Sequence, residues 1–282
     1  MKSYKTVNGL RRSIASLKAQ GRRIAFIPTM GALHEGHISL VRMAVQDGCE
    51  AVVSIFVNPS QFNNQEDLAH YPRMPEKDSQ LLVRAGCSLL FIPSVEEVYP
   101  PGLDVSLHID LEGKDQVMEG VFRPGHFKGM LEVVKRLLDI VEPDFLYMGQ
   151  KDFQQYSLVA HMLRMLNLSP VLRIGETLRE PDGLAMSSRN LRLTPEFRQK
   201  APVIFRALNH ARAQLPLIPV SKIQEECLSM IAAEGLKPEY FELVDGNSLT
   251  AVSDPARHPN VVACVACWAG AVRLIDNLVL KP

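Results

Sequence analysis

The sequence predicts an α/β fold: a Rossmann-like parallel sheet with helices on both faces, plus a smaller C-terminal α+β domain. Short apolar runs alternate with segments of helical periodicity over about the first 177 residues. These runs are apolar throughout, which is typical of strands buried on both faces of a parallel sheet. After about residue 178, two helical segments precede three strand-like runs. We therefore expect a Rossmann-like domain at residues 1–177 and a smaller domain at residues 178–282.

The elements of the N-terminal part alternate regularly. Strands are expected at residues 23–28, 51–57, 89–92, 145–148 and 171–174. Helices are expected at residues 7–20, 36–45, 75–85, 127–140 and 154–166. The fourth of these helices has a clear pattern, since Leu131, Val134 and Leu138 align on one face. Because parallel strands end along one edge of the sheet, the residues that follow them are expected to form the ligand site.

The C-terminal part has a different order of elements. Helices are expected at residues 195–215 and 221–234, and strands at 240–244, 261–268 and 271–275. Only Ala269 and Gly270 separate the last two strands, which predicts an antiparallel hairpin. Cys264 and Cys267 form a C-x-x-C pair on the first strand of this hairpin. Residues three apart on a strand point to opposite faces, so we expect these thiols to pack in the core rather than share a metal or a disulfide.

Composition and charge exclude several classes of protein. The chain has 282 residues, of which 46% are hydrophobic, and its 31 basic residues equal its 31 acidic ones. This balance, without a basic stripe, predicts no nucleic-acid partner. We find no apolar stretch long enough to span a membrane and no secretory signal, and the five cysteines are scattered. We therefore expect a cytoplasmic protein with reduced thiols.

The junction after the first strand carries the strongest chemical signal. Residues 30–37 read Met-Gly-Ala-Leu-His-Glu-Gly-His, and a helix follows at once. Such a junction directs backbone N–H groups and the positive end of a helix dipole at a ligand. His34 and His37 share one face of the helix start, and Gly36 leaves room for a flat ring against the backbone. The pair is expected to stabilise charge on a phosphate under attack. Two metal ligands are the alternative, but the spacing is not that of H-E-x-x-H.

Polar residues also follow two other predicted strands. Asn58 and Gln61 come after the second strand, where their amides can bind hydroxyls and a carboxylate. A turn formed by Asn-Pro is the alternative for Asn58. Lys151 and Asp152 open a helix after the strand at residues 145–148. Lys151 can bind phosphates, whereas Asp152 can cap the helix or accept hydrogen bonds from a ribose. Arg123 can bind an anion or form a surface ion pair.

The segment Met186-Ser187-Ser188-Arg189 follows a Pro-Asp-Gly turn at the expected domain boundary. Two hydroxyls and a guanidinium can bind a departing pyrophosphate through several charge-assisted hydrogen bonds. By itself, Ser-Ser-Arg is an ordinary loop sequence. Its position at the boundary favours a lid that closes over a ligand.

Five sequence blocks together resemble the pantothenate synthetase family, within the nucleotidylyltransferase superfamily that carries an H-x-G-H signature. The blocks occur in family order and are Met30-Gly31-Ala32-Leu33-His34-Glu35-Gly36-His37, Phe56-Val57-Asn58-Pro59-Ser60-Gln61-Phe62, Arg123-Pro124-Gly125-His126-Phe127, Gly149-Gln150-Lys151-Asp152-Phe153-Gln154-Gln155, and Asp182-Gly183-Leu184-Ala185-Met186-Ser187-Ser188-Arg189-Asn190. H-x-G-H alone is specific only to the superfamily, whereas the five blocks together are highly specific. The chain departs from the family at Gln150, where Glu is common, so we assign this position no charge-dependent role.

The resemblance implies an AMP-forming ligase. In this family, pantoate attacks the α-phosphate of ATP to give pantoyl adenylate and pyrophosphate, and β-alanine then displaces AMP to give pantothenate. The implied cofactor is Mg²⁺, with Asp78 as its protein contact, and the implied assembly is a homodimer. The C-terminal domain is expected to act as a lid.

The resemblance also assigns roles to individual residues. The implied catalytic residues are His34, His37, Lys151, Ser187, Ser188 and Arg189. The implied ATP-binding residues are Met30, Gly31, Ala32, Leu33, His34, Glu35, Gly36, His37, Gly149, Gln150, Lys151, Asp152, Leu178 (through its backbone), Met186, Ser187, Ser188 and Arg189. Gln61 and Gln155 are the residues that the resemblance implies for pantoate. Asn58 and Arg123 join them as candidates for pantoate or β-alanine because of their residue types and positions.

Two other functions are compatible with parts of the pattern. Another nucleotidylyltransferase would share His34 and His37 but would not explain Asn58, Gln61 and Gln155 together. A non-catalytic nucleotide sensor on the same fold would bind ATP without releasing pyrophosphate. A tRNA-charging enzyme is disfavoured by the chain length and the neutral charge.

Overall fold

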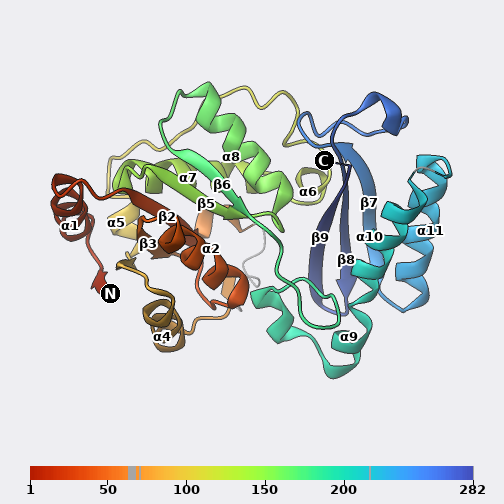
Figure 1. The fold of residues 1–282 in the computed structure, drawn as a ribbon, viewed down its shortest axis with the longest axis horizontal. Coiled ribbons are helices and arrows are strands. Elements are labelled where there is room, and N and C mark those ends of the chain that lie inside the picture. Colours follow the sequence, from red (N-terminus) through yellow and green to blue (C-terminus); the bar gives the residue numbers. More distant parts are fainter. Residues whose placement is uncertain (63–67, 70, 216, 282) are drawn as a thin grey trace. The chain divides into compact units, whose positions relative to one another are not determined.

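The computed structural model describes residues 1–62, 68–69, 71–215 and 217–281, and the chain divides into two compact units (Figure 1). The first unit consists of Met1–Leu111, Arg123–Gly149 and Leu158–Glu176. The second consists of Glu112–Phe122, Gln150–Ser157 and Thr177–Pro282. Two short segments from the N-terminal part of the sequence are therefore grouped with the C-terminal unit. In the described part of the chain, no helix has the length and apolar character needed to cross a membrane.

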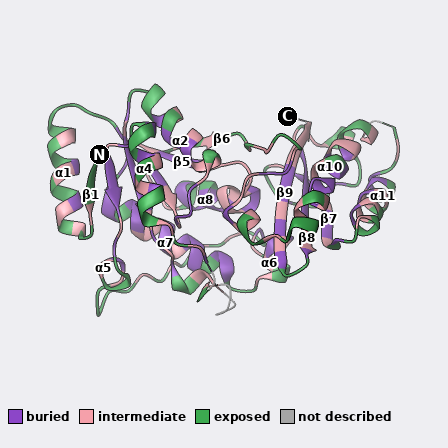
Figure 2. Ribbon diagram, turned by 90° about the horizontal axis from the view of Figure 1, so that it is seen from below, coloured by how far each residue is buried: buried purple, intermediate pink, exposed green. Residues whose placement is uncertain are grey.

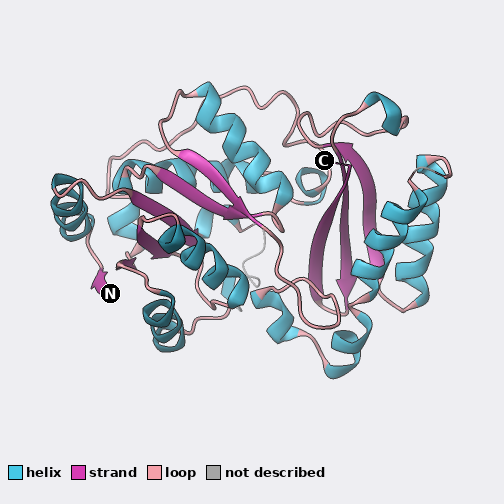
Figure 3. Ribbon diagram, viewed as in Figure 1, coloured by secondary structure: helices cyan, strands magenta, loops and turns pink. Residues whose placement is uncertain are grey.

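The first unit contains a six-stranded parallel sheet in the order β1-β4-β3-β2-β5-β6. Strands are magenta in Figure 3. Its strands are β1 (Lys2–Tyr4), β2 (Ile24–Thr29), β3 (Glu50–Ile55), β4 (Leu89–Phe91), β5 (Phe145–Gly149) and β6 (Val171–Gly175). The predicted parallel sheet is confirmed. β1 was not predicted, because its three residues are too few and too polar to form an apolar run.

Helices cover both faces of this sheet. They are α1 (Val7–Ala19), α2 (Glu35–Gln46), α4 (Pro75–Ala85), α5 (Val95–Val98), α7 (His126–Val141) and α8 (Phe153–Met165), and the first turn of α8 is grouped with the second unit. Ala25 and Ile27 of β2 form a core with Val41 of α2 and Leu82 of α4. Side chains alternate along a strand, so the neighbouring Phe26 lies on the opposite face, where α7 contacts β2. The central strands β2, β3, β4 and β5 are mostly buried, whereas the edge strands β1 and β6 are largely exposed or half-buried (Figure 2).

The second unit is built on an antiparallel sheet in the order β7-β8-β9. Its strands are β7 (Lys237–Asp245), β8 (Val261–Ala269) and β9 (Val272–Lys281), and its helices are α6 (Glu119–Phe122), α9 (Pro195–Lys200), α10 (Val203–Gln214) and α11 (Val220–Ala233). The hairpin between β8 and β9 confirms the expected antiparallel connection. Cys267 packs in the core formed with α10 and α11, whereas Cys264 belongs to the core on the other face. The two thiols therefore point apart, as predicted.

One predicted helix is wrong in extent. Residues 195–215 form two helices, α9 and α10, rather than one. Pro202 lies at the break and is the N-cap residue of α10. Proline has no N–H to bond to the carbonyl four residues earlier, and its ring clashes with that carbonyl, so a continuous helix cannot pass through this position.

The segment Glu112–Phe122 is held to the rest of the second unit by buried charged and polar side chains. Arg273 of β9 forms two hydrogen bonds with the Glu119 carboxylate, at 2.7 and 2.8 Å, and the hydroxyl of Tyr240 donates to the same carboxylate at 2.8 Å. Arg273 also pairs with Glu239. Gln154 of α8 donates to the carbonyl of Val117 and accepts from the N–H of Glu119. These contacts join residues more than 30 positions apart in sequence.

The turn after β7 depends on an ionised carboxylate and predicts a change of stability with pH. Asp245 accepts hydrogen bonds from the N–H groups of Asn247 and Ser248, both at 2.9 Å, and contacts His258 at 3.0 Å. The backbone N–H of Ser248 is the main cause that lowers the pKa of Asp245 from 3.8 to about 2. A lowered pKa in the folded state stabilises the protein above the unfolded pKa, and this contribution is lost as the pH falls towards 2.

Asp245→Asn is therefore expected to lower the free energy of unfolding at pH 7 by about 2 kcal/mol, since one pKa unit corresponds to about 1.4 kcal/mol. Urea unfolding, followed through the fluorescence of Trp268 (the chain's only tryptophan), measures this value in the second unit. The difference from the parent protein should shrink between about pH 4 and pH 2. Asp254→Asn is the matched control, because Asp254 accepts one exposed backbone hydrogen bond. A difference that stays constant over this pH range would contradict the assignment.

Candidate active site

The loop between β2 and α2 is held in a tight conformation by Asp78. Gly31 has φ +85° and Ala32 has φ +50°, a left-handed conformation that costs energy for alanine. The Asp78 carboxylate accepts from the N–H of Ala32 at 2.9 Å and of Leu33 at 2.8 Å. A Cβ on Gly31 would lie 3.0 Å from Ile55 and 3.2 Å from Asp78. Glycine is therefore required at position 31.

This geometry gives Asp78 a role that the sequence did not predict. Its side chain is 1% exposed, and both oxygens accept backbone hydrogen bonds. Burial raises the pKa of Asp78 above its ordinary value, while the N–H groups of Leu33 and Ala32 act in the opposite direction. The visible function of this carboxylate is to shape the loop. Its expected contact with Mg²⁺ stays a prediction, and among the described residues no group of three or more His, Cys, Asp and Glu side chains is arranged to hold a metal.

The two histidines of the junction form a reciprocal cap at the start of α2. Nδ1 of His34 accepts from the N–H of Gly36 at 3.2 Å, and Nδ1 of His37 accepts from the N–H of His34 at 3.4 Å. Their ring centroids lie 4.1 Å apart. A nitrogen that accepts a hydrogen bond carries no hydrogen, so each neutral ring has its N–H at Nε2. The cap therefore orients both rings and defines their tautomers.

Gly36 leaves room for a neighbouring ring of the protein. A Cβ at this position would lie 2.9 and 3.0 Å from ring atoms of His34. The expected space at Gly36 for a flat ligand ring stays a prediction. Glu35, another expected ATP-binding position, forms an exposed ion pair with Arg42 at 2.7 Å.

The segment after β3 places Gln61 beside the junction. The Gln61 side-chain amide is 2.8 Å from the sulfur of Met30. Asn58, in contrast, is 1% exposed, and its amide is bound within the protein. It donates to the carbonyl of Gly129 at 3.2 Å and accepts from the hydroxyl of Tyr99 at 3.0 Å. The Gln61 side chain thus lies beside the junction, whereas Asn58 supports the loop that carries Gln61.

His126 connects Arg123 to this loop, a role that the sequence did not predict. Its Nε2 lies 3.1 Å from Nη1 of Arg123, and its Nδ1 lies 2.8 Å from the carbonyl of Gln61. A guanidinium only donates, so Nε2 accepts and Nδ1 carries the hydrogen that is donated to Gln61. The signal in the sequence was the Arg-Pro-Gly-His block, from which only the arginine was selected. The sequence also did not predict the role of Gly129. A Cβ at this position would lie 2.5 Å from the carbonyl oxygen of Ser60, so the close approach of α7 to this loop requires glycine.

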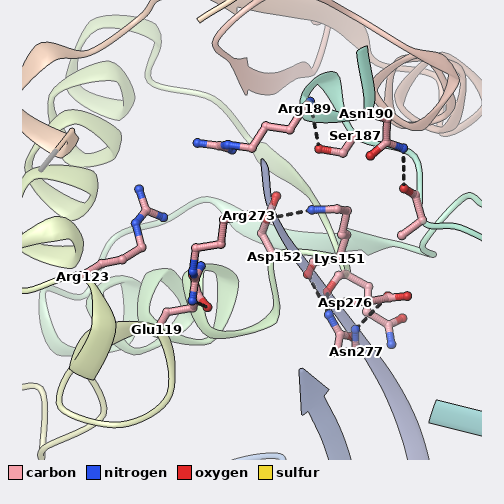
Figure 4. Close-up of polar contacts among 12 residues, drawn as sticks. Glu119, Arg123, Lys151, Asp152, Ser187, Arg189, Asn190, Arg273, Asp276 and Asn277 are labelled. Atoms are coloured by element: carbon pink, nitrogen blue, oxygen red, sulfur yellow. Dashed lines mark hydrogen bonds and ion pairs between the residues drawn. The ribbon is translucent and has the colours of Figure 1, made fainter. Parts of the chain in front are cut away.

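The other expected ATP-binding residues lie in the second unit, except Gly149, which ends β5 in the first unit. Gln150, Lys151 and Asp152 form the turn before α8, and the Lys151 ammonium lies 3.6 Å from the Asp152 carboxylate (Figure 4). The side-chain amide of Asn277 donates to the carbonyls of Gln150 at 3.0 Å and Lys151 at 2.7 Å. Gln155, on the first turn of α8, is half-buried.

The segment from Leu178 to Arg189 begins as a narrow hairpin. The N–H of Met186 donates to the carbonyl of Leu178 at 2.9 Å, so part of the Leu178 backbone is already paired. Ser187 caps the 3₁₀ helix Ser188–Arg192, and its hydroxyl accepts from the N–H of Arg189 at 3.2 Å. Ser188 is 7% exposed. Ser187 and Arg189 therefore stand together on one short turn.

The predicted site residues thus form two groups, one in each unit. The first unit contains Met30, Gly31, Ala32, Leu33, His34, Glu35, Gly36, His37, Asn58, Gln61, Asp78, Arg123 and Gly149. The second contains Gln150, Lys151, Asp152, Gln155, Leu178, Met186, Ser187, Ser188 and Arg189. Their roles in binding and catalysis stay predictions.

The parallel sheet with two histidines capping the helix after a central strand has the arrangement expected for the H-x-G-H signature of the nucleotidylyltransferase superfamily. A family model described as pantoate-beta-alanine ligase matches residues 2–279. The chain therefore belongs to the pantoate–beta-alanine ligase family. The predicted resemblance, the α/β fold class and the AMP-forming ligase class are confirmed.

Individual relatives match over their whole length. A pantothenate synthetase of Porphyromonas gingivalis is 45% identical over 280 residues, which cover 99% of both chains. The crystal structure of a pantothenate synthetase from Thermus thermophilus is 38% identical, with a TM-score of 0.92 over 100% of both chains. A pantoate-beta-alanine ligase of Francisella tularensis, crystallised with beta-gamma ATP and beta-alanine, is 35% identical, with a TM-score of 0.83 over 99% of this chain and 98% of that one.

Proposed function

We propose that this chain condenses pantoate with β-alanine at the expense of ATP, through a pantoyl-adenylate intermediate. The observation that carries the proposal is the reciprocal cap of His34 and His37 at the start of α2. It places two imidazole donors at the positive end of a helix, where negative charge on a phosphate is stabilised. Family membership over nearly the whole chain supports the choice of substrates.

In the first step, a carboxylate oxygen of pantoate attacks the α-phosphorus of ATP, and the bond to the β-phosphate oxygen breaks. Charge grows on the α-phosphate oxygens and on the departing pyrophosphate. The Nε2–H groups of His34 and His37 are proposed to donate to the α-phosphate oxygens, where fixed donors lower the barrier most. Gln61 and Gln155 are proposed to bind pantoate through their amides.

The second unit is proposed to supply the cations for the triphosphate. Lys151 would act as a mobile point charge, while the guanidinium of Arg189 and the hydroxyls of Ser187 and Ser188 would bind the departing pyrophosphate. Magnesium is proposed to enter bound to the ATP phosphates, which is its usual mode in enzymes of this kind. Both oxygens of the Asp78 carboxylate already accept hydrogen bonds from the backbone N–H groups of Ala32 and Leu33, so we assign Asp78 no direct contact with this ion.

In the second step, the amine of β-alanine attacks the acyl carbon of the adenylate. A carbon–nitrogen bond forms, the carbon–oxygen bond to AMP breaks, and a proton leaves the nitrogen. The positioning of two bound reactants contributes much of the rate in such a step. The products are pantothenate and AMP. We further propose that the protein works in the cytoplasm as a homodimer, and that residues 178–282 act as a lid over the domain formed by residues 1–177.

Product analysis by mass spectrometry tests the proposed reaction. Purified protein is incubated with Mg-ATP, pantoate and β-alanine, and each component is omitted in turn. Pantothenate and AMP should appear only in the complete mixture. AMP or CMP attached to another acceptor would indicate a different nucleotidylyltransferase, and binding of ATP without any turnover would indicate a nucleotide sensor.

Gln61→Ala is expected to raise the KM for pantoate by about 10-fold or more, since a hydrogen bond to a charged group contributes about 1.5–3 kcal/mol. The KM for ATP should stay within about 2-fold, because the neighbouring histidine cap does not involve the Gln61 side chain. Steady-state kinetics with each substrate varied separately measures both values. Gln20→Ala, an exposed glutamine on α1, is the control. An unchanged KM for pantoate would refute the role of Gln61.

A further inference from the structure

Two adjacent residues of β9, Asp276 and Asn277, contact two separate segments that the proposed function assigns to ATP. Asn277 donates both amide hydrogens to backbone carbonyls, those of Gln150 and Lys151. Neighbouring side chains on a strand point to opposite faces, so Asp276 is directed elsewhere. Asn277 thereby fixes the backbone of the turn from which the Lys151 ammonium extends (Figure 4).

Asp276 holds the hairpin that leads to Ser187 and Arg189. Its carboxylate forms a two-fold contact with the guanidinium of Arg179, at 2.6 and 3.1 Å. The same guanidinium donates to the carbonyl of Gly183 at 3.1 Å and lies 3.9 Å from the centre of the Phe205 ring. These contacts hold the planar guanidinium of Arg179 from several sides, so its side chain has little conformational freedom. The hairpin starts at Leu178 and closes at Met186, directly before Ser187.

Stability alone does not explain this pair of polar residues. Asp276 is 4% exposed and Asn277 is 3% exposed, and burial of polar groups on a strand is unfavourable unless every group is paired. Oδ1 of Asn277 has no hydrogen-bond partner among the described residues, which costs about 1–3 kcal/mol for a buried acceptor. Apolar residues would pack here at lower cost. The polar atoms that are paired are the Asp276 carboxylate, which contacts Arg179, and the Asn277 amide nitrogen, which contacts the turn at Lys151.

We propose that Asp276 and Asn277 are positioning residues for ATP: one strand fixes both the Lys151 turn and the hairpin that carries Ser187 and Arg189. β9 is paired with β8 along its whole length, so it provides a rigid reference for both segments. The inference rests on the proposed role of Lys151 and Arg189 in binding the triphosphate. Asp276 and Asn277 touch no substrate in this account, and they act through the segments that they hold.

Asn277→Leu tests the inference, because leucine keeps the volume and removes both donors. The KM for ATP is expected to rise by about 10-fold, the loss of one to two hydrogen bonds that hold the turn. The KM values for pantoate and β-alanine should stay within about 2-fold. If Asn277→Leu does not fold, Asn277→Ser is used instead. Serine is smaller, and its side chain is too short to donate to the carbonyls of Gln150 and Lys151. Asp276→Asn, which weakens the Arg179 contact, is expected to shift the KM for ATP in the same direction.

A matched control separates positioning from general loosening of the sheet. Val265 of β8 lies opposite Asp276 in the register, is 1% exposed and is not part of the proposed machinery. Val265→Ala should lower the stability of the same sheet and leave the KM for ATP unchanged. An equal rise in the KM for ATP, at an equal loss of stability, would overturn the proposal.

A double-mutant cycle with Lys151→Ala distinguishes failure of the inference from failure of the proposed site. If Asn277 acts through Lys151, the two changes will be strongly non-additive in the KM for ATP. If Lys151→Ala raises the KM for ATP strongly, but Asn277→Leu has no effect or an effect that simply adds to that of Lys151→Ala, the inference alone is overturned. A silent Lys151→Ala would overturn the assignment of Lys151 to ATP, and the inference with it.

Discussion

His37→Ala is expected to lower kcat by about 10²–10³-fold, the usual loss when one fixed donor to a developing negative charge is removed. The Nδ1 of His37 is held by the N–H of His34, so its N–H lies at Nε2 and is oriented before substrate binds. The KM for ATP should change much less, because the interaction strengthens only as charge develops on the α-phosphate. Single-turnover measurement of pyrophosphate release isolates this step.

Two further variants separate the donor role from helix capping. His37→Asn keeps a side-chain oxygen that can accept from the N–H of His34, so the cap can persist while the donor moves. We expect its stability to be near that of the parent and its kcat to stay low. His108→Ala, at an exposed histidine of the first unit, should have the activity of the parent. A kcat for His37→Ala within about 5-fold of the parent, well short of the usual loss, would contradict the donor role.

Arg273→Met is expected to lower the free energy of unfolding of the second unit by about 3–5 kcal/mol. Arg273 pairs with Glu119 at 2.7 Å and Glu239 at 2.7 Å, and the three side chains are 14% exposed or less. Its removal leaves two buried carboxylates without their cation, and the desolvation cost of unpaired charges is large. The fluorescence of Trp268, whose indole N–H donates to Glu239, follows the unfolding of this region.

The same chain offers a surface pair for comparison. Arg206 and Glu234 form an ion pair in which the side chains are 53% and 41% exposed. Arg206→Met should cost less than about 1 kcal/mol, since exposed pairs contribute little. Replacing both carboxylates in the Arg273→Met background, by Glu119→Gln and Glu239→Gln, should recover much of the loss. A loss of under about 1 kcal/mol for Arg273→Met would show that this buried network contributes no more than a surface pair.

The sequence predicted the regular parts of the fold because their signals are local. Apolar runs identified five strands of the parallel sheet, and a two-residue connection identified the hairpin between β8 and β9. The signal for the break between α9 and α10, Pro202, is also local. The helical periodicity on both sides of Pro202 nevertheless favoured one continuous helix. The grouping of Glu112–Phe122 with the second unit could not be predicted, since it depends on contacts such as that between Glu119 and Arg273, 154 positions apart.

The sequence predicted which residue types occur at the candidate site better than it predicted which groups those residues contact. The spacing of His34 and His37 indicated a shared face at the start of a helix, and the structure shows that pairing. Their tautomers, in contrast, follow only from the backbone N–H groups that the rings meet. Asp78 and Asn58 illustrate the same limit, because a carboxylate or amide in the sequence can serve a ligand or the backbone. In both cases the side chain bonds to the protein's own backbone.

Isotope transfer from the acid to AMP tests the central claim most directly. Pantoate labelled with ¹⁸O in its carboxylate is converted in the presence of Mg-ATP and β-alanine, and the products are weighed by mass spectrometry. Formation of pantoyl adenylate requires that one carboxylate oxygen bridge to the α-phosphorus, so we expect one ¹⁸O in each AMP released. AMP without label, or label in inorganic phosphate, would contradict activation of the acid as an adenylate.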